Sequence, residues 1–272
     1  MNYERKRAPV AVILAAGLGA GLSPLTDKCQ KSLLSVGGSF LIERMMRNCL
    51  SCGIAQFVLV LGHRAEEVRK FVDKTFRGVR VTYVINPRYR DTGSGYSLML
   101  AAAAVGTSEF IKFDADVVFD VKILRRLVDH DLSDVLCIDS HATLDAQEIK
   151  VATDVDMQVI EFGRSLDPSL AQGEYIGIEK ISAKTGPLVF AELTLMMEDK
   201  AHLQADYAVA YARLLEKELI FQALDIVGLD WTEIRTVEDF ERANKMFGTP
   251  ITTISRGQQR ALDEAAEAAT KA

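Results

Sequence analysis

Apolar runs that alternate with helical patterns fill the first half of this sequence and constrain its fold most strongly. The runs, which we expect to be strands, are VAVILAA (10–16), QFVLVLG (56–62), VRVTYVI (79–85) and EFIKFDAD (109–116). The spacing of apolar residues between them predicts three helices, which end near Cys52, span 64–76 and span 96–105. Regular alternation of this kind predicts a parallel sheet with helices on both faces.

After residue 130 the pattern changes. We expect four short strands, then two helices, then one more strand and a strand end that leads into a helix. These segments are 134–140, 148–154, 157–163, 175–181, 188–201, 205–218, 219–227 and 231–247. The tail from Ser255 has few large apolar residues, so we expect residues 255–272 to form a loose helix or to be disordered.

Charge and composition exclude two classes of partner. The net charge of −6 over 272 residues argues against a nucleic-acid-binding protein, because a phosphate backbone requires a basic surface. The basic and then apolar N-terminus superficially resembles a secretory signal, but glycines from Gly17 onward interrupt it. The charge-free span from Ala8 to Thr26 holds three glycines and Pro24, which makes it a poor membrane helix. We therefore expect a cytoplasmic protein that binds neither nucleic acid nor membrane.

The four cysteines are Cys29, Cys49, Cys52 and Cys137. Cys49 and Cys52 form a CxxC pair, a spacing found in redox and zinc sites. They also end a helical pattern that stops at Gly53, and no second CxxC or histidine pair completes a metal site. We predict that these cysteines are structural thiols.

The glycine-rich stretch AAGLGAGL after the first strand suggests an anion-binding loop, and several interpretations compete. A P-loop is excluded because no Gly-Lys-Ser/Thr follows. A dinucleotide fingerprint is disfavoured by the spacing of Gly17, Gly19 and Gly21 and by Pro24. A structural turn stays open. A loop over a nucleoside triphosphate, with Lys31 as a distant cation, explains the glycines, the proline and the lysine together.

The stretch AVILAAGLGAGLSPLTDKCQKSLLSVGG resembles the opening of nucleotidyltransferases that join a nucleoside triphosphate to a phosphorylated small molecule. The resemblance covers residues 9 to about 246 and continues through YVINPRYRDTGSGYSL, FIKFDADVVFD, EIKV, GEYIGIEKIS and DWTEIRTVEDFERA. Several of these motifs are similar to one branch of the family. That branch contains the cytidylyltransferases that act on phosphocholine, inositol 1-phosphate and 2-aminoethylphosphonate.

The resemblance implies a three-layer α/β fold, Rossmann-like, of the nucleotide-diphospho-sugar transferase type, with a mixed central sheet. It implies a single domain over 1–254, with a nucleotide-binding half (about 9–140) and an acceptor-binding half (about 141–254). The implied reaction is cytidylyl transfer from CTP to a small phosphorylated or phosphonylated alcohol, with release of pyrophosphate and with Mg²⁺ as the cofactor.

The resemblance also implies a nucleotide site. Lys31 would act on the α-phosphate, Asp116 would bind Mg²⁺, and Asn86 with the 93–95 turn would contact the base. The implied nucleotide-binding residues are Ala15, Ala16, Gly17, Leu18, Gly19, Ala20, Asn86, Gly93, Ser94, Gly95 and Asp114. Asp114 and Asp116 alternate at the end of a strand, so we expect their side chains on opposite faces.

On the acceptor side, Lys150 and Arg164 match cations that the family directs toward the substrate phosphate. Arg164 stands where lysine is usual, and it adds bidentate geometry while it keeps the charge. Glu174 matches a residue that holds a substrate hydroxyl or amine. Tyr207 lies on a helix near that pocket.

Three residues depart from the family pattern. Gly21 replaces the loop arginine, Ala208 replaces an acid, and Arg235 replaces the acid that would complete the Mg²⁺ site with Asp116. Arg235 would either pair with Asp116 in place of the metal or neutralise the triphosphate itself. As a further alternative, Glu233 would supply the second carboxylate.

These departures leave two other functions open. One is a catalytically weakened homologue that binds a nucleotide as a sensor or scaffold. The other is an active enzyme that uses UTP or GTP. The acceptor's identity and a homodimeric state are also left open by the sequence.

Overall fold

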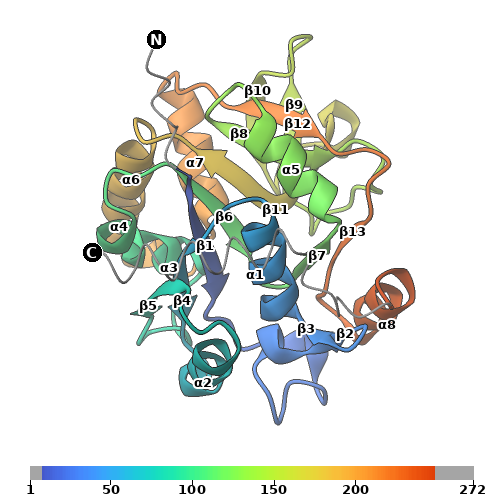
Figure 1. Ribbon diagram of the computed structural model, residues 1–272. Coiled ribbons are helices and arrows are strands. Elements are labelled where there is room, and N and C mark those ends of the chain that lie inside the picture. Colours follow the sequence, from blue (N-terminus) through green and yellow to red (C-terminus); the bar gives the residue numbers. More distant parts are fainter. Residues whose placement is uncertain (1–7, 249–272) are drawn as a thin grey trace, which may run out of the picture.

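The structure is a computed structural model that describes residues 8–248, so the predicted tail over 255–272 lies outside the described residues. A nine-stranded sheet runs through its centre (Figure 1). Its strands are β1 (Val10–Ala15), β4 (Gln56–Leu61), β5 (Arg80–Ile85), β6 (Phe110–Asp114), β8 (Val135–Asp139), β9 (Lys150–Thr153), β10 (Val159–Gly163), β11 (Gly173–Ile181) and β12 (Gln222–Asp225).

The sheet is mixed, as predicted. Its order is β10-β9-β11-β6-β1-β4-β5, and β8 pairs with both β11 and β12. The four strands predicted in the first half pair in parallel, whereas β11 runs antiparallel to β6. Both halves of the chain therefore contribute strands to one sheet, and β6 and β11 join them.

Helices cover both faces of this sheet and give the predicted three layers (Figure 1). The helices are α1 (Leu41–Ser51), α2 (Ala65–Thr75), α3 (Ser94–Leu100), α4 (Ala102–Val105), α5 (Val121–Asp129), α6 (Gly186–Glu198), α7 (Tyr207–Glu216) and α8 (Val237–Met246). Successive residues of β1 face opposite layers, as the period of two in a strand requires. Ile13 packs with α1, α2 and α5, whereas Val12 packs with α3, α6 and α7.

The prediction of one continuous helix over the alanine-rich segment 96–105 is wrong. The segment forms α3 and α4, which are separated at Ala101. The backbone N–H of Ala101 donates to the carbonyl of Leu98, three residues back, and this bond tightens the chain there.

Several short elements were not predicted. They are β2 (Ser35–Val36), β3 (Ser39–Phe40), β7 (Val117–Phe119) and the 3₁₀ helices η1 (Ala20–Leu22), η2 (Lys31–Leu33), η3 (Pro168–Leu170) and η4 (Lys200–His202). Two of them, β7 and η2, contribute residues to the cavity described below. β7 pairs antiparallel with β13 (Trp231–Glu233), and Glu233 lies opposite Val117 in the register. A small third core cluster joins Leu22 of η1 to Ile234 and to α8. The end of the described chain thus packs against the glycine loop.

The prediction of buried structural thiols is met in part for the CxxC pair, because Cys49 is buried whereas Cys52 is half-buried. All four cysteines are free, and Cys49 is fully buried in the core while Cys52 packs against it. Burial raises the pKa of the Cys49 thiol, so the reactive thiolate is disfavoured there. Within residues 8–248 no group of three or more His, Cys, Asp or Glu side chains is arranged to hold a metal ion. Over the same residues no helix is long and apolar enough to cross a membrane.

Candidate active site

A cavity of about 290 Å³ opens where β1 and β6 end, between the two halves of the chain. The carboxyl ends of parallel strands are the usual place for a ligand site in such sheets. Most of the predicted site residues line it: Ala15, Ala16, Gly17, Gly19, Lys31, Asn86, Gly93, Ser94, Asp114, Asp116, Arg164, Glu174 and Tyr207.

Four predicted residues lie outside the cavity wall, each for a visible reason. Leu18 and Ala20 are exposed on the outer side of the glycine loop. Gly95 is buried in α3, close to Met197. Lys150 is 1% exposed, and its Nζ donates to the Asp145 and Glu148 carbonyl oxygens at 2.8 and 3.2 Å. Lys150 thus holds the loop before β9 rather than facing the cavity, which corrects the expectation of a substrate-facing cation.

The glycine loop leaves open space at the end of β1. A Cβ built on Gly17 would meet no atom within 4 Å, and Gly19 has a φ of +68° that a side chain would rarely adopt. The Thr26 hydroxyl donates to the Gly19 carbonyl at 2.8 Å and closes the loop. Gln30, which the sequence did not single out, is 1% exposed and donates to the Ala15 carbonyl at 2.9 Å. The same Gln30 side chain accepts a hydrogen bond from the Ser32 backbone N–H and so caps η2, whose first residue is Lys31.

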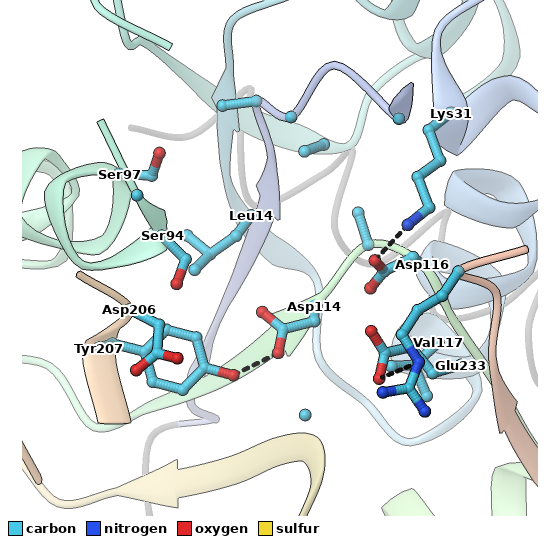
Figure 2. A pocket seen from close by; sticks show the side chains of 18 of the residues that line it. Leu14, Lys31, Ser94, Ser97, Asp114, Asp116, Val117, Asp206, Tyr207 and Glu233 are labelled. Atoms are coloured by element: carbon cyan, nitrogen blue, oxygen red, sulfur yellow. Dashed lines mark hydrogen bonds and ion pairs between the residues drawn. The ribbon is translucent and has the colours of Figure 1, made fainter. Parts of the chain in front are cut away.

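Lys31 and Asp116 face one another across the cavity (Figure 2). Lys31 Nζ lies 2.6 Å from Asp116 Oδ2, although the two residues come from separate elements. The side chains are 17% and 23% exposed, so the pair is accessible to a ligand.

Asp114 and Asp116 both line the cavity, which corrects the expectation of opposite faces. The expectation was wrong on the strand rule itself, because a period of two places every second residue on the same face, and Asp116 follows directly after β6. Asp114 Oδ2 accepts from the Tyr207 hydroxyl and lies 3.1 Å from Nζ of the fully buried Lys112. Burial raises the pKa of Asp114, Lys112 opposes this shift, and the charge of Asp116 adds to it. A Cβ on Gly177 of β11 would lie 2.8 Å from Asp114 Oδ2, so glycine is needed opposite this carboxylate.

Asn86 and Gly93 hold together the part of the cavity wall that lies between β5 and α3. Asn86 Nδ2 donates to Thr92 Oγ1 at 3.1 Å and to Ser97 Oγ at 3.0 Å, which spans the loop between β5 and α3. The Gly93 N–H donates to the Leu203 carbonyl at 2.8 Å, and a Cβ on Gly93 would lie 2.3 Å from the Ala205 carbonyl oxygen. The 93–95 turn therefore requires glycine because it packs against the segment before α7.

The carboxylate beside Asp116 is that of Glu233 (Figure 2). The β7–β13 pairing brings it there, and the Ile234 N–H donates to the Asp116 carbonyl at 3.0 Å. Burial, followed by the negative charge of Asp116, raises the pKa of Glu233 to about 8. Of the alternatives left open by the sequence, this geometry matches a second carboxylate supplied by Glu233.

Arg235 pairs elsewhere. Its Nη2 lies 2.9 Å from Glu148 Oε1, and its Nε lies 3.7 Å from Glu233 Oε2. No ion pair between Arg235 and Asp116 is found in the part of the chain that the structure describes. Glu233 is the last residue of β13, whereas Arg235 lies in the segment that follows this strand.

Gly21 lies directly against this segment, because a Cβ there would be 2.7 Å from the Arg235 carbonyl oxygen. We expect Gly21→Arg, which restores the family's residue, to reduce the free energy of unfolding by about 1–3 kcal/mol, because the backbone at Arg235 must move to make room. The same displacement should lower kcat/KM. Urea unfolding measures the loss of stability. The matched control is Gly17→Ala, whose Cβ meets no atom within 4 Å. Equal stability of the two variants would contradict the packing argument.

On the acceptor side, Arg164 Nε lies 3.1 Å from Asp206 Oδ2, and Arg164 Nη1 donates to the Gln147 carbonyl. Asp206 caps α7 by accepting from the Ala208 N–H at 3.1 Å. Asp206 also lines the cavity, so an acid is present just before Tyr207 although residue 208 carries none. Asp206 was not predicted as a site residue, because the family pattern places the acid at position 208.

Glu174 of β11 is 7% exposed and lines the cavity, and among residues 8–248 its carboxylate has no hydrogen-bond partner. Burial, followed by the negative charge of Glu148, raises the pKa of Glu174 to about 7. A buried carboxyl without a partner in the protein is available to a ligand group.

Glu174 should make stability depend on pH. Its pKa is raised above the ordinary value of 4.5, so its stabilising contribution is present below pH 4.5 and is lost as pH rises through about 7. Relative to Glu174→Gln, the wild type should lose on the order of 2–3 kcal/mol of unfolding free energy between pH 4.5 and 8. Urea unfolding across this range measures it. The exposed Glu161 is the control, and a Glu174 difference as flat as that of Glu161→Gln would refute the assignment.

Residues 11–182 match the family described as the MobA-like NTP transferase domain. The chain belongs to this family. The resemblance inferred from the glycine loop and the later motifs is therefore confirmed.

Curated relatives of this NTP transferase chain include three bacterial proteins. CMP-5'-(3-aminopropyl)phosphonate synthase of Streptomyces rubellomurinus is 33% identical over 117 residues, which cover 43% of this chain and 18% of that protein. The bifunctional IPC transferase and DIPP synthase of Aquifex aeolicus is 26% identical over 238 residues, covering 86% and 51%. Choline-phosphate cytidylyltransferase of Streptococcus pneumoniae is 36% identical over 106 residues, covering 39% and 44%. The matches thus span about half or less of each relative's length.

Solved structures share the fold. The inositol-1-phosphate CTP transferase from T. maritima superposes with a TM-score of 0.73 at 19% identity, over 89% of this chain and 98% of that one. The CTP:phosphocholine cytidylyltransferase from Streptococcus pneumoniae gives 0.73 at 24% identity, over 88% and 99%. The predicted nucleotide-diphospho-sugar transferase-like fold is confirmed.

Proposed function

We propose that this protein transfers the cytidylyl group of CTP to a small phosphorylated or phosphonylated alcohol and releases pyrophosphate. The observation that carries this proposal is the convergence of the open glycine loop, Lys31 and the neighbouring carboxylates of Asp116 and Glu233 in one cavity with Arg164. Phosphoryl-type transfer needs positioning and charge neutralisation rather than a covalent intermediate, and these residues supply both.

The charges of the cavity wall favour a divalent cation among the ligands. Six carboxylates line it, whereas three side chains there are cationic: Asp114, Asp116, Glu148, Glu174, Asp206 and Glu233 against Lys31, Arg164 and Arg235. A triphosphate and a phosphorylated acceptor would add further negative charge. Such ligands would bind a wall with this excess of acid more readily together with a cation.

The donor set fits Mg²⁺. Mg²⁺ is commonly bound through one or two carboxylates together with substrate phosphates. Asp116 and Glu233 would hold it; burial and then the negative charge of Asp116 raise the pKa of Glu233, and a bound cation would oppose both effects. When bound, the ion would neutralise charge on the triphosphate. The binding-only alternative drew on the loss of a carboxylate at position 235, and Glu233 supplies one beside Asp116.

In the proposed reaction, a phosphate or phosphonate oxygen of the acceptor attacks the α-phosphorus of CTP. The new P–O bond forms as the bond from the α-phosphorus to the pyrophosphate oxygen breaks, so the electron pair leaves with pyrophosphate. Lys31 stabilises the charge that develops on the α-phosphate oxygens. The loop backbone orients the nucleotide, and Arg164 orients the acceptor.

The preference for CTP draws on the names of the relatives. Two relatives are named cytidylyltransferases: the choline-phosphate enzyme is 36% identical over 106 residues, and the 2-aminoethylphosphonate enzyme is 30% identical over 108. A uridylyltransferase, UTP--glucose-1-phosphate uridylyltransferase AglF of Haloferax volcanii, is 34% identical over 73 residues, so UTP is the nucleotide to compare.

The test is pyrophosphate release from CTP, UTP and GTP with phosphocholine, 2-aminoethylphosphonate or inositol 1-phosphate as the acceptor. We expect release that requires CTP, one acceptor and Mg²⁺. Release from UTP or GTP in preference to CTP would overturn the base assignment. Melting-temperature shifts with CTP but no release with any acceptor would favour the binding-only alternative.

A further inference from the structure

Arg235 is a cation on the cavity wall for which the proposed reaction has so far given no role. It comes from the segment between β13 and α8, and its side chain is 34% exposed. Its carbonyl oxygen fills the space where a Gly21 side chain would lie. At this point of the wall the cationic group therefore comes from residue 235, and the glycine loop contributes backbone alone.

Some N–H donors of the Arg235 guanidinium have no hydrogen-bond acceptor among the described residues. Its one side-chain hydrogen bond among residues 8–248 goes from Nη2 to Glu148 Oε1 at 2.9 Å. A guanidinium carries five N–H donors, and Nε is also paired with Glu233 Oε2 at 3.7 Å, so the donors that face neither carboxylate are available to a ligand in the cavity. A planar fork of this kind matches the oxygens of a phosphoryl group.

Glu148 is held in place independently of Arg235. It is 6% exposed, and its Oε2 accepts from the Asp145 N–H at 2.9 Å. Lys150, beneath the loop, binds the Asp145 and Glu148 carbonyls. Glu148 is thus a fixed counter-ion that aims the guanidinium.

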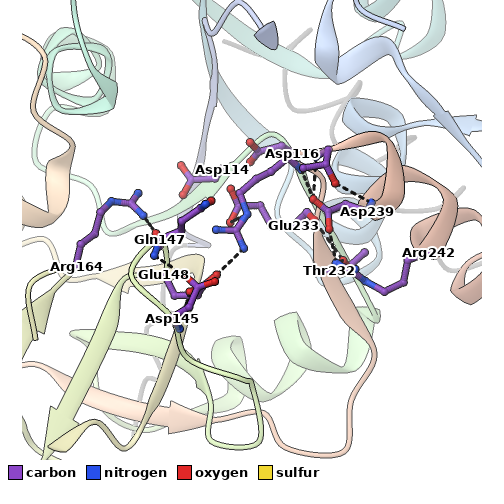
Figure 3. A network of polar contacts seen from close by, with 12 residues as sticks. Asp114, Asp116, Asp145, Gln147, Glu148, Arg164, Thr232, Glu233, Asp239 and Arg242 are labelled. Atoms are coloured by element: carbon purple, nitrogen blue, oxygen red, sulfur yellow. Dashed lines mark hydrogen bonds and ion pairs between the residues drawn. The ribbon is translucent and has the colours of Figure 1, made fainter. Parts of the chain in front are cut away.

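Two arginines reach adjacent residues of the same loop. Arg164 donates to the Gln147 carbonyl, and Arg235 donates to the Glu148 carboxylate (Figure 3). Arg164 follows the end of β10 and Arg235 follows the end of β13, and the Gln147–Glu148 segment is contacted by both. A phosphoryl group over this segment would meet guanidinium donors from both.

We propose that Arg235 binds the phosphoryl or phosphonyl group of the acceptor, and that Glu148 holds the guanidinium until that group arrives. This proposal rests on the proposed function and names the residue that selects for a phosphate-bearing acceptor. Upon binding, the acceptor's oxygens take up free guanidinium donors, and Glu148 keeps Arg235 oriented. The triphosphate is assigned to Lys31 and the metal carboxylates; Glu233 is one of these and lies 3.7 Å from Arg235 Nε, whereas Nη2 points to Glu148.

The test measures equilibrium binding by calorimetry, without turnover, for CTP, for phosphocholine with choline as its dephosphorylated counterpart, and for inorganic phosphate. Arg235→Gln should weaken phosphocholine and phosphate binding by about 10- to 100-fold and leave CTP affinity within about twofold. Arg235→Lys should restore part of the loss. Arg242→Gln, which removes an arginine paired with Asp239 on α8, is the control and should change neither affinity.

Three results would overturn the proposal. In the first, Arg235→Gln weakens CTP binding but leaves phosphate binding unchanged. In the second, the wild type binds phosphocholine and choline with equal affinity. In the third, phosphate affinity is unchanged in every variant. Glu148→Gln separates a structural role, because it removes the ion pair but leaves the guanidinium. A loss in Glu148→Gln as large as in Arg235→Gln would also contradict direct binding. Phosphate-dependent binding without pyrophosphate release would reject the proposed function alone.

Discussion

Replacement of Lys31 by alanine is expected to lower kcat for pyrophosphate release by about 10²–10³-fold, the usual cost of one preorganised group that stabilises developing charge. Lys31 is placed for this by η2 and by the Gln30 side chain, and its Nζ already lies 2.6 Å from Asp116. The loss should fall mainly on kcat, because the charge on the α-phosphate grows toward the transition state. Initial rates at saturating CTP measure it.

Lys28→Ala is the matched control for Lys31→Ala. Lys28 lies on the same loop, is exposed, and contributes its backbone carbonyl to Arg64 at 2.8 Å, a contact that the substitution keeps. Its rate should stay within about twofold of the wild type, since an exposed charge contributes little. Equal losses in the two variants would mean that general positive charge matters and that Lys31 has no specific role.

Lys112→Met is expected to reduce the free energy of unfolding by about 3–5 kcal/mol, the cost of removing one partner from a buried ion pair. Lys112 is fully buried in β6, and its Nζ lies 3.2 Å from Glu179 Oε2 and 3.1 Å from Asp114 Oδ2. Glu179 is also fully buried and accepts from the Tyr211 hydroxyl at 2.6 Å. Burial raises the pKa of Glu179 while Lys112 lowers it, so the lysine favours the ionised carboxylate. Urea unfolding measures the loss.

A double-mutant cycle separates the ion pair from packing. Lys112→Met/Glu179→Gln should recover part of the stability that Lys112→Met loses, because the fully buried partner is then neutral and only Asp114, whose side chain is 24% exposed, has lost its lysine. Lys122→Met, on the exposed start of α5, is the control and should cost little. Additive losses in the double variant would show that the buried lysine acts through packing rather than charge.

Much of the fold followed from local patterns. The four apolar runs of the first half are β1, β4, β5 and β6, and they pair in parallel because helices connect them. The short strands after residue 130 and the helices α6, α7 and α8 also formed where turn residues and apolar spacing placed them. In these segments burial on one face or both leaves a periodic record in the sequence.

The site followed less completely, because its decisive contacts join distant segments. The pairing of β7 with β13 brings Glu233 beside Asp116, and two three-residue strands give no periodic pattern to detect. Gln30 was missed because its role, a buried hydrogen bond to the end of β1, needs a partner fifteen residues away. The contact of Gly21 with Arg235 likewise appears in three dimensions alone. Two departures from the family pattern are thus one packing unit.

The most direct measurement is ³¹P NMR of the wild-type protein with CTP and each of phosphocholine, 2-aminoethylphosphonate and inositol 1-phosphate, with and without Mg²⁺. We predict that one acceptor yields pyrophosphate and a new pair of coupled phosphorus resonances in equal amounts. The product should require Mg²⁺ and should disappear in Asp116→Asn and Glu233→Gln. Unchanged CTP with every acceptor, or hydrolysis of CTP without a coupled product, would contradict the transferase.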